Sequence, residues 1–466
     1  MDALGSAIRV DVRGREVMRI LPRVNDAVNE EWISDKTRHV SDGLRTQRLD
    51  RPYVRENGKL RPATWQEAFN TIAARMENVN PDKVGVIAGD LAGAEEMYAA
   101  RELFSKAGCR NFDCRQDGSR LGTQHGRASY LFNATIEGID QADAILLVGT
   151  NPRLEAAVLN ARIRRRWRHG GVRIGVVGAP ADLTYDYELI GKGPDALASL
   201  ADGKHAFAGV LAQAKNPLVI VGSGALNRDD SEAILALAAR IATDAGKDKA
   251  AGWNTFNVLH HAASRVAGLD LGFLPAKGGR DLAAMLKGDM EVVYLLGADD
   301  FDVSKLGNAF VIYQGTHGDA GAHRADVILP AAAYTEKDAT YVNTEGRAQQ
   351  TSKAAFPPGD AKEDWAIIRA LSDRLGAKLP FDSLQALRTQ MIKATPSLGR
   401  LDRVEAEEGD AIARIASDAR QKVSDRPFAP AITDFYFTNP IARASAVMAE
   451  LSALRTGNAR DQQAAE

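Results

Sequence analysis

Short apolar runs alternate with helix-like segments along most of this 466-residue chain. Buried strands are predicted at residues 84–88, 144–148, 173–177, 218–221, 292–296, 310–313 and 327–329, with amphipathic helices between them at 94–106, 155–168 and 230–242. Apolar strands that alternate with amphipathic helices form parallel sheets covered on both faces. The strands are too many for one domain, so the predicted fold class is α/β with two doubly wound α/β/α domains.

The chain divides into three predicted parts. Residues 1–57 are expected to form a small β domain around a hairpin at 6–20, and residues 58–360 hold the two interleaved α/β/α domains. The second part opens with a helix at 65–78, whose start is marked by Thr64 and Glu67 in capping-box spacing. Residues 361–466 form a helical C-terminal segment, with helices at 363–375 and 405–417 and a polar, frayed tail over the last twelve residues.

Composition excludes several classes of protein. The net charge of -2 gives no reason to expect nucleic acid or an anionic membrane as a partner, and no apolar run approaches the roughly 20 residues that span a bilayer. Cys109 and Cys114 are the only cysteines, too few for a disulfide scaffold or for a four-cysteine iron–sulfur cluster. We expect both to be structural, the alternative being a thiolate ligand or nucleophile.

Three motifs offer binding chemistry, and each has a simpler interpretation. The turn at Gly222–Asn227 follows a strand as a dinucleotide turn does, but Asn227 replaces the third glycine and no acidic residue follows at ribose spacing, so packing is favoured over a nucleotide. The side chains of His317, Asp319, His323 and Asp326 are possible metal ligands, for which hydrogen-bonded turn residues are the favoured interpretation. The basic run 162–169 is interpreted as a solvated helix end, with a docking surface for an acidic neighbour as the alternative.

The stretch 315–350 combines features of a ligand-facing sheet edge. A turn rich in Gly, His and Asp precedes the apolar run 326–330, which Pro330 ends because proline offers no N–H to a strand partner. Small residues and the polar run Asn343-Thr344-Glu345-Gly346-Arg347 follow. A strand followed by a polar loop is how α/β folds present side chains to ligands.

Several long blocks resemble one family, the molybdopterin-oxidoreductase-like part of the large G-type iron–sulfur subunit of respiratory complex I (NADH:quinone oxidoreductase), in its mitochondrial and alphaproteobacterial form. The blocks are GREVMRILPRVNDAVNEEWISDKTR (14–38), LLVGTNPRLEAAVLNARIRRRW (146–167), ADVILPAAAYTEKDATYVNTEGRAQQT (325–351) and EDWAIIRALSD (363–373).

The resemblance implies a cofactor-binding fold that has lost its cofactor. Ser34 stands where the small domain's last cysteine ligand is expected, Met1–Ser6 contains no cysteine, and the family's complex I members are not thought to use a molybdenum cofactor. The ferredoxin-like region that carries the family's clusters is not found in this chain, which is therefore expected to be a fragment or split gene product. The implied role is a scaffold among other peripheral-arm subunits, on the cytoplasmic face of a bacterial inner membrane or the matrix side of a mitochondrial one.

No catalytic, cofactor-binding or metal-binding residue is therefore expected in this chain. The polar side chains of the old ligand edge, Glu336, Asn343, Glu345 and Arg347, are expected to bond to one another instead. The alternatives are a catalytic molybdopterin- or nucleotide-binding oxidoreductase and a free-standing binding protein unrelated to respiration.

Overall fold

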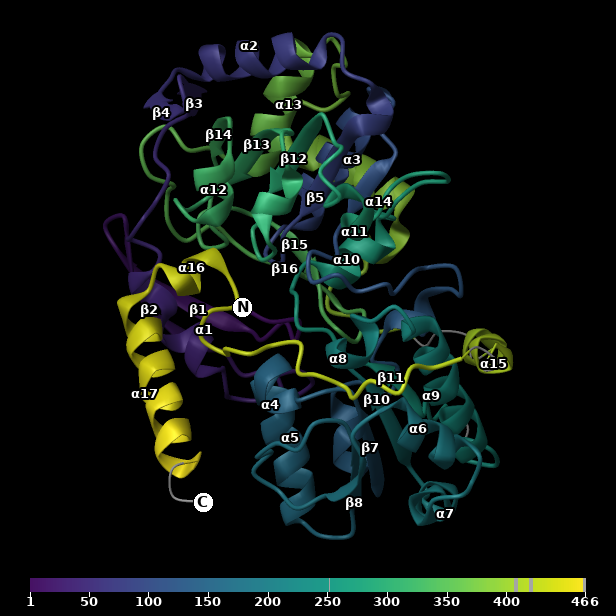
Figure 1. Ribbon diagram of the computed structural model, residues 1–466. Coiled ribbons are helices and arrows are strands. Elements are labelled where there is room, and N and C mark those ends of the chain that lie inside the picture. The colour runs from purple at the N-terminus through teal and green to yellow at the C-terminus, as the bar shows by residue number, and fades with distance from the viewer. Residues whose placement is uncertain (251, 406–409, 419–421, 464–466) are drawn as a thin grey trace.

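The computed structural model describes residues 1–250, 252–405, 410–418 and 422–463 (Figure 1). Its N-terminal part is an antiparallel ribbon of β1 (Ile8–Arg13) and β2 (Glu16–Pro22), followed by the short helix α1 (Asp35–His39). The ribbon buries Val17 and Ile20 against a core that includes Met448 of the last helix. The expected hairpin is therefore present.

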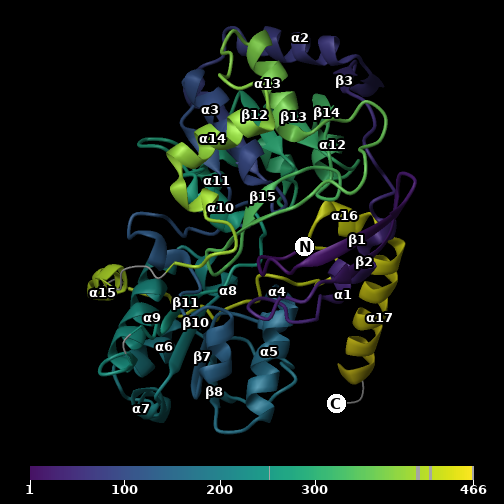
Figure 2. The ribbon, with the colours of Figure 1, turned by 180° about the vertical axis from the view of Figure 1, so that it is seen from behind.

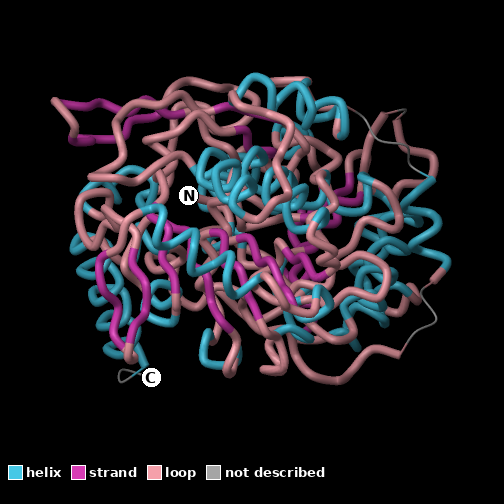
Figure 3. The backbone as a smooth tube through the Cα atoms, turned by 90° about the horizontal axis from the view of Figure 1, so that it is seen from above, coloured by secondary structure: helices cyan, strands magenta, loops and turns pink. Residues whose placement is uncertain are grey.

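A seven-stranded sheet forms the upper domain in Figure 1, in the order β4-β3-β14-β13-β12-β5-β6. Five strands are parallel; β3 is antiparallel to β14, and the edge strand β4 is antiparallel to β3. The strands are β3 (Tyr53–Glu56), β4 (Lys59–Pro62), β5 (Val84–Ala88), β6 (Asn111–Asp113), β12 (Val292–Leu296), β13 (Phe310–Gly315) and β14 (Val327–Pro330). Helices lie on either side of the strands when the molecule is seen from above (Figure 3). They are α2 (Trp65–Met76), α3 (Ala94–Lys106), α10 (Arg265–Asp270), α11 (Leu282–Met285), α12 (Ala320–Arg324), α13 (Asp364–Arg374) and α14 (Leu384–Ala394).

A five-stranded parallel sheet forms the lower domain, in the order β11-β10-β7-β8-β9. Its strands are β7 (Ala144–Val148), β8 (Arg173–Val177), β9 (Glu188–Gly191), β10 (Pro217–Val221) and β11 (Phe256–Val258). Its helices are α4 (Pro152–Glu155), α5 (Ala157–Arg168), α6 (Pro194–Ala201), α7 (Ala206–Gln213), α8 (Ser223–Leu226) and α9 (Ser231–Ala245). This domain is inserted between the strands of the first, so the predicted pair of interleaved α/β/α domains is confirmed.

Local signals set several of these boundaries. The capping box at the start of α2 is present, since Thr64 Oγ1 accepts from Glu67 N at 3.2 Å and Glu67 Oε2 accepts from Thr64 N at 2.7 Å. β3 pairs with β14 and so belongs to the seven-stranded sheet, although it precedes residue 57. The predicted domain boundaries at 57 and 360 stay a prediction.

The C-terminal segment differs from its prediction. Its helices include α15 (Asp410–Ser417), which lies within the predicted 405–417, of which 406–409 fall outside the described residues. The tail was expected to fray, yet α17 (Ala446–Gln463) is helical through residue 463. This expectation was wrong because the start of α17 packs on the N-terminal core through Met448. The helix lies beside the β1–β2 ribbon in both views (Figures 1 and 2).

Between α15 and α17 the chain crosses the molecule in extended form. We call residues 422–445 the strap; it runs between the two domains and includes only the short helix α16 (Pro440–Arg443) (Figure 1). A second antiparallel ribbon, β15 (Thr340–Val342) with β16 (Ala348–Gln350), follows the seven-stranded sheet. No helix in the described part of the chain is long and apolar enough to cross a membrane.

Candidate functional site

The carboxyl ends of the two parallel sheets meet at one interface, which is where ligands bind in α/β folds. Asp90 follows β5 of the upper sheet, and His261 follows β11 of the lower sheet. The Ser264 N–H donates to the Asp90 carbonyl at 3.0 Å and ties the two ends together. The side chains gathered here, which we call the strand-end cluster, are Lys36, Asp90, Asp117, Glu155, His261 and Arg265.

His261 lies at the centre of this cluster. Its Nδ1 is 2.8 Å from Ser223 Oγ, and its Nε2 is 3.7 Å from Asp90 Oδ2 and 3.8 Å from Asp117 Oδ2. Burial lowers the pKa of the imidazole below its ordinary value, against the raising effect of Asp117. Ser223 and the two aspartates lie at opposite nitrogens of the imidazole, but the carboxylates are too far from Nε2 for a hydrogen bond, and the adjoining cavity of about 10 Å³ has room for about one water molecule. The arrangement has no room for a substrate.

Two of the three carboxylates of the cluster, Asp90 and Asp117, differ in proton affinity. Burial raises the pKa of Asp90 to about 6. Burial would also raise the pKa of Asp117, but the Arg265 guanidinium, 2.8 Å from Asp117 Oδ1, holds that pKa well below its ordinary value. At neutral pH Asp117 is therefore ionised, while the charge of Asp90 depends on pH.

Glu155 fills the place in which the glycine turn would hold a phosphate. Its Oε2 accepts from Ser223 N at 3.2 Å, and its Oε1 accepts from Asn151 N at 2.8 Å and from Thr150 Oγ1 at 3.0 Å. The N–H at the start of α8 is thus taken by a carboxylate, which would repel a phosphate. A Cβ on Gly224 would meet the Ala429 carbonyl at 2.4 Å, so the strap also covers this turn. These contacts support a packing role for the turn.

The strap closes the rest of the interface. Arg443 donates from Nη2 to Asp299 Oδ1 at 2.7 Å and from Nε to Asp319 Oδ2, and it also binds Asp300. Lys36 Nζ donates to Thr438 Oγ1 at 2.6 Å. Burial lowers the pKa of Lys36 to about 8. Charged side chains of the upper domain and of the N-terminal part are therefore bound to the strap.

A second buried ion cluster lies beneath the strand ends of the upper sheet. Lys337 Nζ lies 2.8 and 2.9 Å from the two carboxylate oxygens of Glu96 and 2.8 Å from Asp364 Oδ2. Burial, followed by the nearby Asp364, raises the pKa of Glu96 to about 8. Two carboxylates share one ammonium ion here, so Glu96 retains a proton at neutral pH. The adjoining cavity of about 50 Å³ has room for water but not for an organic cofactor.

Three of the four polar residues of the predicted ligand edge bond to one another. Arg347 Nε donates to Glu345 Oε1 at 2.8 Å, and Asn343 Nδ2 donates to the same oxygen at 3.3 Å. Glu336 does not join them; it forms a two-pronged ion pair with Arg48 at 2.6 Å. The mutual-bonding prediction is confirmed for Asn343, Glu345 and Arg347 and wrong for Glu336, because Arg48 from a distant segment reaches it.

His317, Asp319 and Asp326, named above as possible metal ligands, form hydrogen bonds or ion pairs with other protein groups. His317 is buried, its Nε2 lies 2.8 Å from the Gly43 carbonyl, and burial lowers the pKa of its imidazole to about 4. Asp319 binds Ala320 N and Arg443, and Asp326 accepts from Val311 N at 2.8 Å. No group of three or more His, Cys, Asp or Glu side chains in the described ranges has a geometry that could hold a metal ion. The hydrogen-bonded turn interpretation agrees with these contacts.

The cysteines and Ser34 have structural contacts. Cys109 and Cys114 are free and buried, and burial raises the pKa of each thiol to about 12. Cys109 Sγ donates to the Val84 carbonyl at 3.0 Å. Ser34 caps α1 by accepting from Thr37 N at 3.2 Å. None of the three is prepared for nucleophilic or ligand chemistry at neutral pH.

The basic run on α5 is partly internal. Arg162 is buried and pairs with Asp140 at 2.7 Å, while Arg165 pairs with Asp140 and with Glu30 from the N-terminal part. Arg164 and Arg166 donate to backbone carbonyls. The solvated-face interpretation was therefore wrong for the buried Arg162, whereas Arg164, Arg165, Arg168 and His169 are exposed as it expected.

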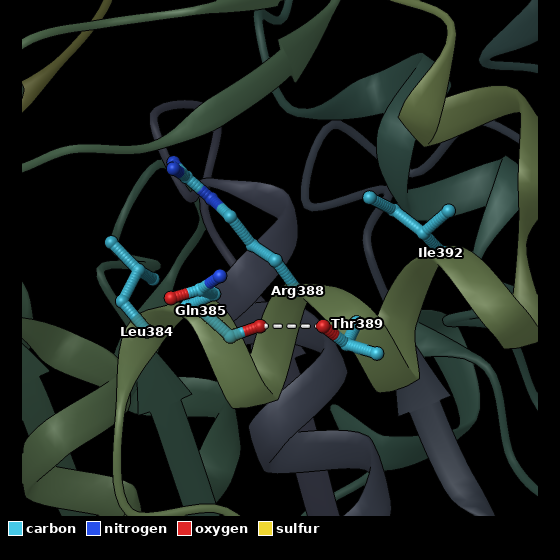
Figure 4. Close-up of a pocket in the computed structure, with 5 residues that line it drawn as sticks. All are labelled: Leu384, Gln385, Arg388, Thr389 and Ile392. Carbon is cyan, nitrogen blue, oxygen red and sulfur yellow. Dashed lines mark hydrogen bonds between the residues drawn. The ribbon is translucent and has the colours of Figure 1, made fainter.

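A hollow on the outer surface offers no comparable chemistry. It measures about 610 Å³ and is lined by one face of α14, with Leu384, Gln385, Arg388, Thr389 and Ile392 (Figure 4). Gln385 is bonded along the helix to Thr389, and Arg388 donates to Glu95 Oε1 at 2.7 Å. The hollow has no cluster of titratable side chains.

Comparison with known proteins identifies the fold's relatives. Residues 48–374 match a family model described as "Molybdopterin oxidoreductase". The chain belongs to the molybdopterin oxidoreductase family. Residues 1–42 match "NADH-ubiquinone oxidoreductase NDSU1/NuoG-like, 4Fe-4S domain", and residues 403–451 match the model of the C-terminal region of the G-type subunit of NADH-ubiquinone oxidoreductase. The second of these ranges includes the strap, and the resemblance seen in the sequence is confirmed.

Curated relatives in this family are longer than the chain. It is 44% identical over 455 residues to NADH dehydrogenase (ubiquinone) iron-sulfur protein 1, mitochondrial, of Solanum tuberosum, covering 97% of this chain and 60% of the relative. It is 47% identical to the NADH-ubiquinone oxidoreductase 78 kDa subunit of Candida albicans, covering 97% and 62%. It is 43% identical to the G-type subunit of NADH-quinone oxidoreductase of Rickettsia bellii, covering 96% and 64%. The chain thus spans less than two thirds of these proteins.

Solved structures support the family fold. Acetylene hydratase from Pelobacter acetylenicus matches with a TM-score of 0.57 at 12% identity, over 85% of this chain and 71% of that one. A chain of the formyltransferase/hydrolase complex from Methylorubrum extorquens matches with a TM-score of 0.51 at 17% identity, over 70% and 98%. At these identities the likeness shows the fold alone.

The residues present do not fit the family's cofactors. Residues 1–42 match a 4Fe-4S domain but contain no cysteine, and such clusters are held by cysteine thiolates. An organic cofactor needs a cavity of roughly 300 Å³ or more, and those at the strand ends hold about 10 and 50 Å³; a larger groove of about 820 Å³ beside Asn343 and Arg347 has no cysteine in its lining. At the glycine turn, the Glu155 carboxylate takes the N–H of Ser223, and the strap covers Gly224.

Sequence reasoning did not find the strand-end cluster. A signal was present, since Asp90, Asp299 and Asp300 each follow a predicted strand within a few residues. Their partners, Arg265 and Arg443, lie 175 and more than 140 residues away along the chain from Asp90 and Asp300. No local pattern connects such residues.

Proposed function

We propose that this chain is a structural part of the peripheral arm of NADH:quinone oxidoreductase. In this role it supports electron transfer from NADH to quinone through neighbouring cluster-bearing regions and carries no cluster itself. The division into residues 1–57, 58–360 and 361–466 belongs to the same proposal.

The filled cleft between the two sheets is the observation that carries the proposal. In a catalytic member of the fold this edge must admit a cofactor and a substrate. Here it is crossed by the strap, with Arg443 bound to three carboxylates and Lys36 bound to Thr438. The strap lies in the range that matches the C-terminal model of the G-type subunits, which agrees with a role peculiar to those subunits.

The absence of resident cofactors is part of the same proposal. The cysteine-free residues 1–42, the buried protonated thiols and the Glu155 carboxylate at the glycine turn all support it. We propose accordingly that no residue of this chain is catalytic, binds a cofactor or holds a metal.

The partners proposed are the other subunits of the peripheral arm. The location is then the cytoplasmic face of a bacterial inner membrane, or the matrix side of a mitochondrial one. The names of the relatives, which are complex I subunits, support this assignment.

Native membranes provide the test. The chain, carrying an affinity tag, is expected to co-purify from detergent-solubilised membranes with peripheral-arm subunits in a particle far larger than its own 50.1 kDa. The isolated chain is expected to contain neither iron, molybdenum nor pterin in stoichiometric amount by elemental analysis and oxidised-pterin fluorescence.

Two results would contradict the proposal in different ways. A stoichiometric pterin or metal in the isolated chain would favour a catalytic oxidoreductase. A free monomer in the soluble fraction, with no peripheral-arm subunit bound, would favour an unrelated binding protein.

A further inference from the structure

The edges of two β-ribbons border one groove on the surface of the molecule. The groove has a volume of about 820 Å³, lies outside the strand-end cluster and has the size of a ligand site. Consecutive residues 5–10 line one side, and consecutive residues 349–354 line the other. Of these, residues 8–10 belong to β1 and residues 349–350 to β16, so part of each wall is a strand edge.

The first wall is the unpaired edge of β1. Arg23 N donates to the Ala7 carbonyl at 2.9 Å, and hydrogen-bonded pairs alternate along an antiparallel ladder, so Arg9 also faces β2. Ile8 and Val10 then point their N–H and C=O groups away from β2. Pro22, which has no N–H, stands opposite Ile8 at a position that needs none. Among the described strands β1 pairs with β2 alone.

The second wall is the outer edge of β16, which is partly closed because Asp402 N donates to the Ala348 carbonyl at 2.8 Å. Thr351 N donates to the Ala339 carbonyl at 2.9 Å, so by the same alternation Gln350 points its backbone groups away from β15. The opposite edge of this ribbon is already closed, since Thr340 N donates to Glu95 Oε2 at 2.7 Å. Gln350 is therefore the residue of β16 whose outward backbone groups remain available at the groove.

We propose that this groove binds an extended segment of a partner protein, which adds as a β-strand to the edge of β1, of β16, or of both. Unpaired strand edges are templates for such pairing. Main-chain hydrogen bonds supply affinity in this mode, and side-chain pockets supply specificity. Val24, 73% exposed on the rim, offers an apolar contact to the incoming segment.

Charge indicates the character of the partner segment. The lining side chains include four cations, on Arg9, Arg23, Arg347 and Lys353, and two carboxylates, on Asp2 and Asp402. Like charges placed opposite each other across strands are destabilising. A second copy of this chain would bring the same arginine-bearing edge against itself, so the occupant is a different protein with acidic side chains on its strand.

A synthetic strand tests this without reference to the proposed function. The probe is an acetylated, amidated nonapeptide in which valine alternates with glutamate, labelled for fluorescence anisotropy. Two matched peptides carry N-methyl groups on every valine or on every glutamate. Since backbone N–H groups alternate between the two edges of a strand, each methylated peptide loses the donors of one edge and keeps its charge.

The unmodified peptide is expected to bind saturably, one per chain, and at least one methylated peptide is expected to bind about tenfold or more weakly. Weakening by one methylation pattern identifies pairing with one wall, and weakening by both identifies insertion between the walls. Equal affinity for all three peptides would show attraction by charge alone and overturn the proposal.

A protein variant provides the complementary test. Val10→Pro removes the outward N–H of Val10 at an edge position where proline is tolerated, and Val10→Ala removes the same side chain but keeps the N–H. Val10→Pro is expected to bind the probe about tenfold more weakly than Val10→Ala, with equal melting temperatures showing that both are folded. Equal binding would overturn the proposal, as would a concentration-dependent dimer of the unmodified chain that Val10→Pro abolishes, because the occupant would then be a second copy.

Discussion

Arg443 pairs with three carboxylates from two strand ends of the upper sheet. Asp299 and Asp300 follow β12, and Asp319 follows β13. Burial raises the pKa of Asp299 to about 7 and that of Asp300 to about 6, although Arg443 opposes both shifts. Arg443 thus stabilises the ionised form of Asp299, whose side chain has no exposed surface.

Arg443→Met is expected to destabilise the protein by about 3 kcal/mol at pH 8, because it leaves buried carboxylates without a counter-ion. The loss is expected to be smaller at pH 5.5, where the carboxylates bind protons and need no partner. Urea unfolding at both pH values measures it. Arg240→Met, which removes an exposed pair with Asp202, is the control and is expected to show no such pH dependence.

Glu96 is a second residue whose charge depends on its surroundings. Its pKa of about 8 in the folded chain exceeds the ordinary carboxyl value. The folded state therefore holds a proton that the unfolded state has released between roughly pH 4.5 and pH 8. Stability from this group is complete below that window and is lost as the pH rises through it.

Glu96→Gln is expected to flatten the pH dependence of stability. In the unsubstituted chain, Glu96 contributes a fall of up to about 1.4 kcal/mol per pH unit across the window, and glutamine cannot titrate. Unfolding free energies between pH 5.5 and 8 measure the slope. The exposed Glu450 of α17 supplies the control, and a slope equally reduced in Glu450→Gln would count against Glu96 as the source.

At the scale of elements, the strap is held by a few polar contacts at each end. At its start Arg228 donates to the carbonyls of Arg426 and Pro427 at 2.9 and 3.1 Å and to Ser424 Oγ at 2.9 Å. At its end Arg443 binds the upper sheet. The middle contributes Ile432 and Phe435 to a small apolar cluster with Leu154.

Arg228→Ala is expected to loosen the start of the strap while the sheets stay folded. The amides of residues 424–429 should exchange hydrogen markedly faster, and stability should fall by about 2 kcal/mol through loss of buried hydrogen bonds to a charged group. Hydrogen exchange with mass spectrometry resolves this segment. Arg120→Ala, which removes an exposed pair with Asp229, should leave the strap's exchange unchanged.

Elements with strong local signals could be predicted from the sequence. The apolar runs of β5, β7, β8, β10 and β12 and the capping box of α2 depend on neighbours within a few residues. The helix α17 and the buried role of Arg162 could not be predicted, because their polar sequences are stabilised by Met448 packing and by Asp140 in three dimensions. The same reason explains why the partner of Glu336 was missed: Arg48 lies 288 residues away.

At the scale of the molecule, one apolar core crosses both domains. The same cluster of buried side chains contains Val86 and Tyr294 of the upper sheet and Leu146 and Val219 of the lower one. The polar strand-end cluster and the strap add further contacts across the interface. The two sheets are therefore parts of one cooperative structure.

Thermal unfolding is expected to occur in a single transition, with equal calorimetric and van't Hoff enthalpies. Unfolding one domain would expose core side chains of the other to water, so the two domains are expected to unfold together. Differential scanning calorimetry provides the measurement, and two resolved transitions would show that the domains are energetically independent.

The order of the strands also bears on how the chain is made. β5, the second strand from one edge of the seven-stranded sheet, pairs with β12, whose first residue lies about 200 residues further along the chain. At synthesis rates of about 5–20 residues per second, β5 waits for roughly 10–40 seconds before its neighbour leaves the ribosome. Throughout that time an apolar strand with an open edge is exposed, while the inserted five-stranded domain can already fold. We therefore expect the nascent chain to need a chaperone that covers the edge of β5 until β12 has been synthesised.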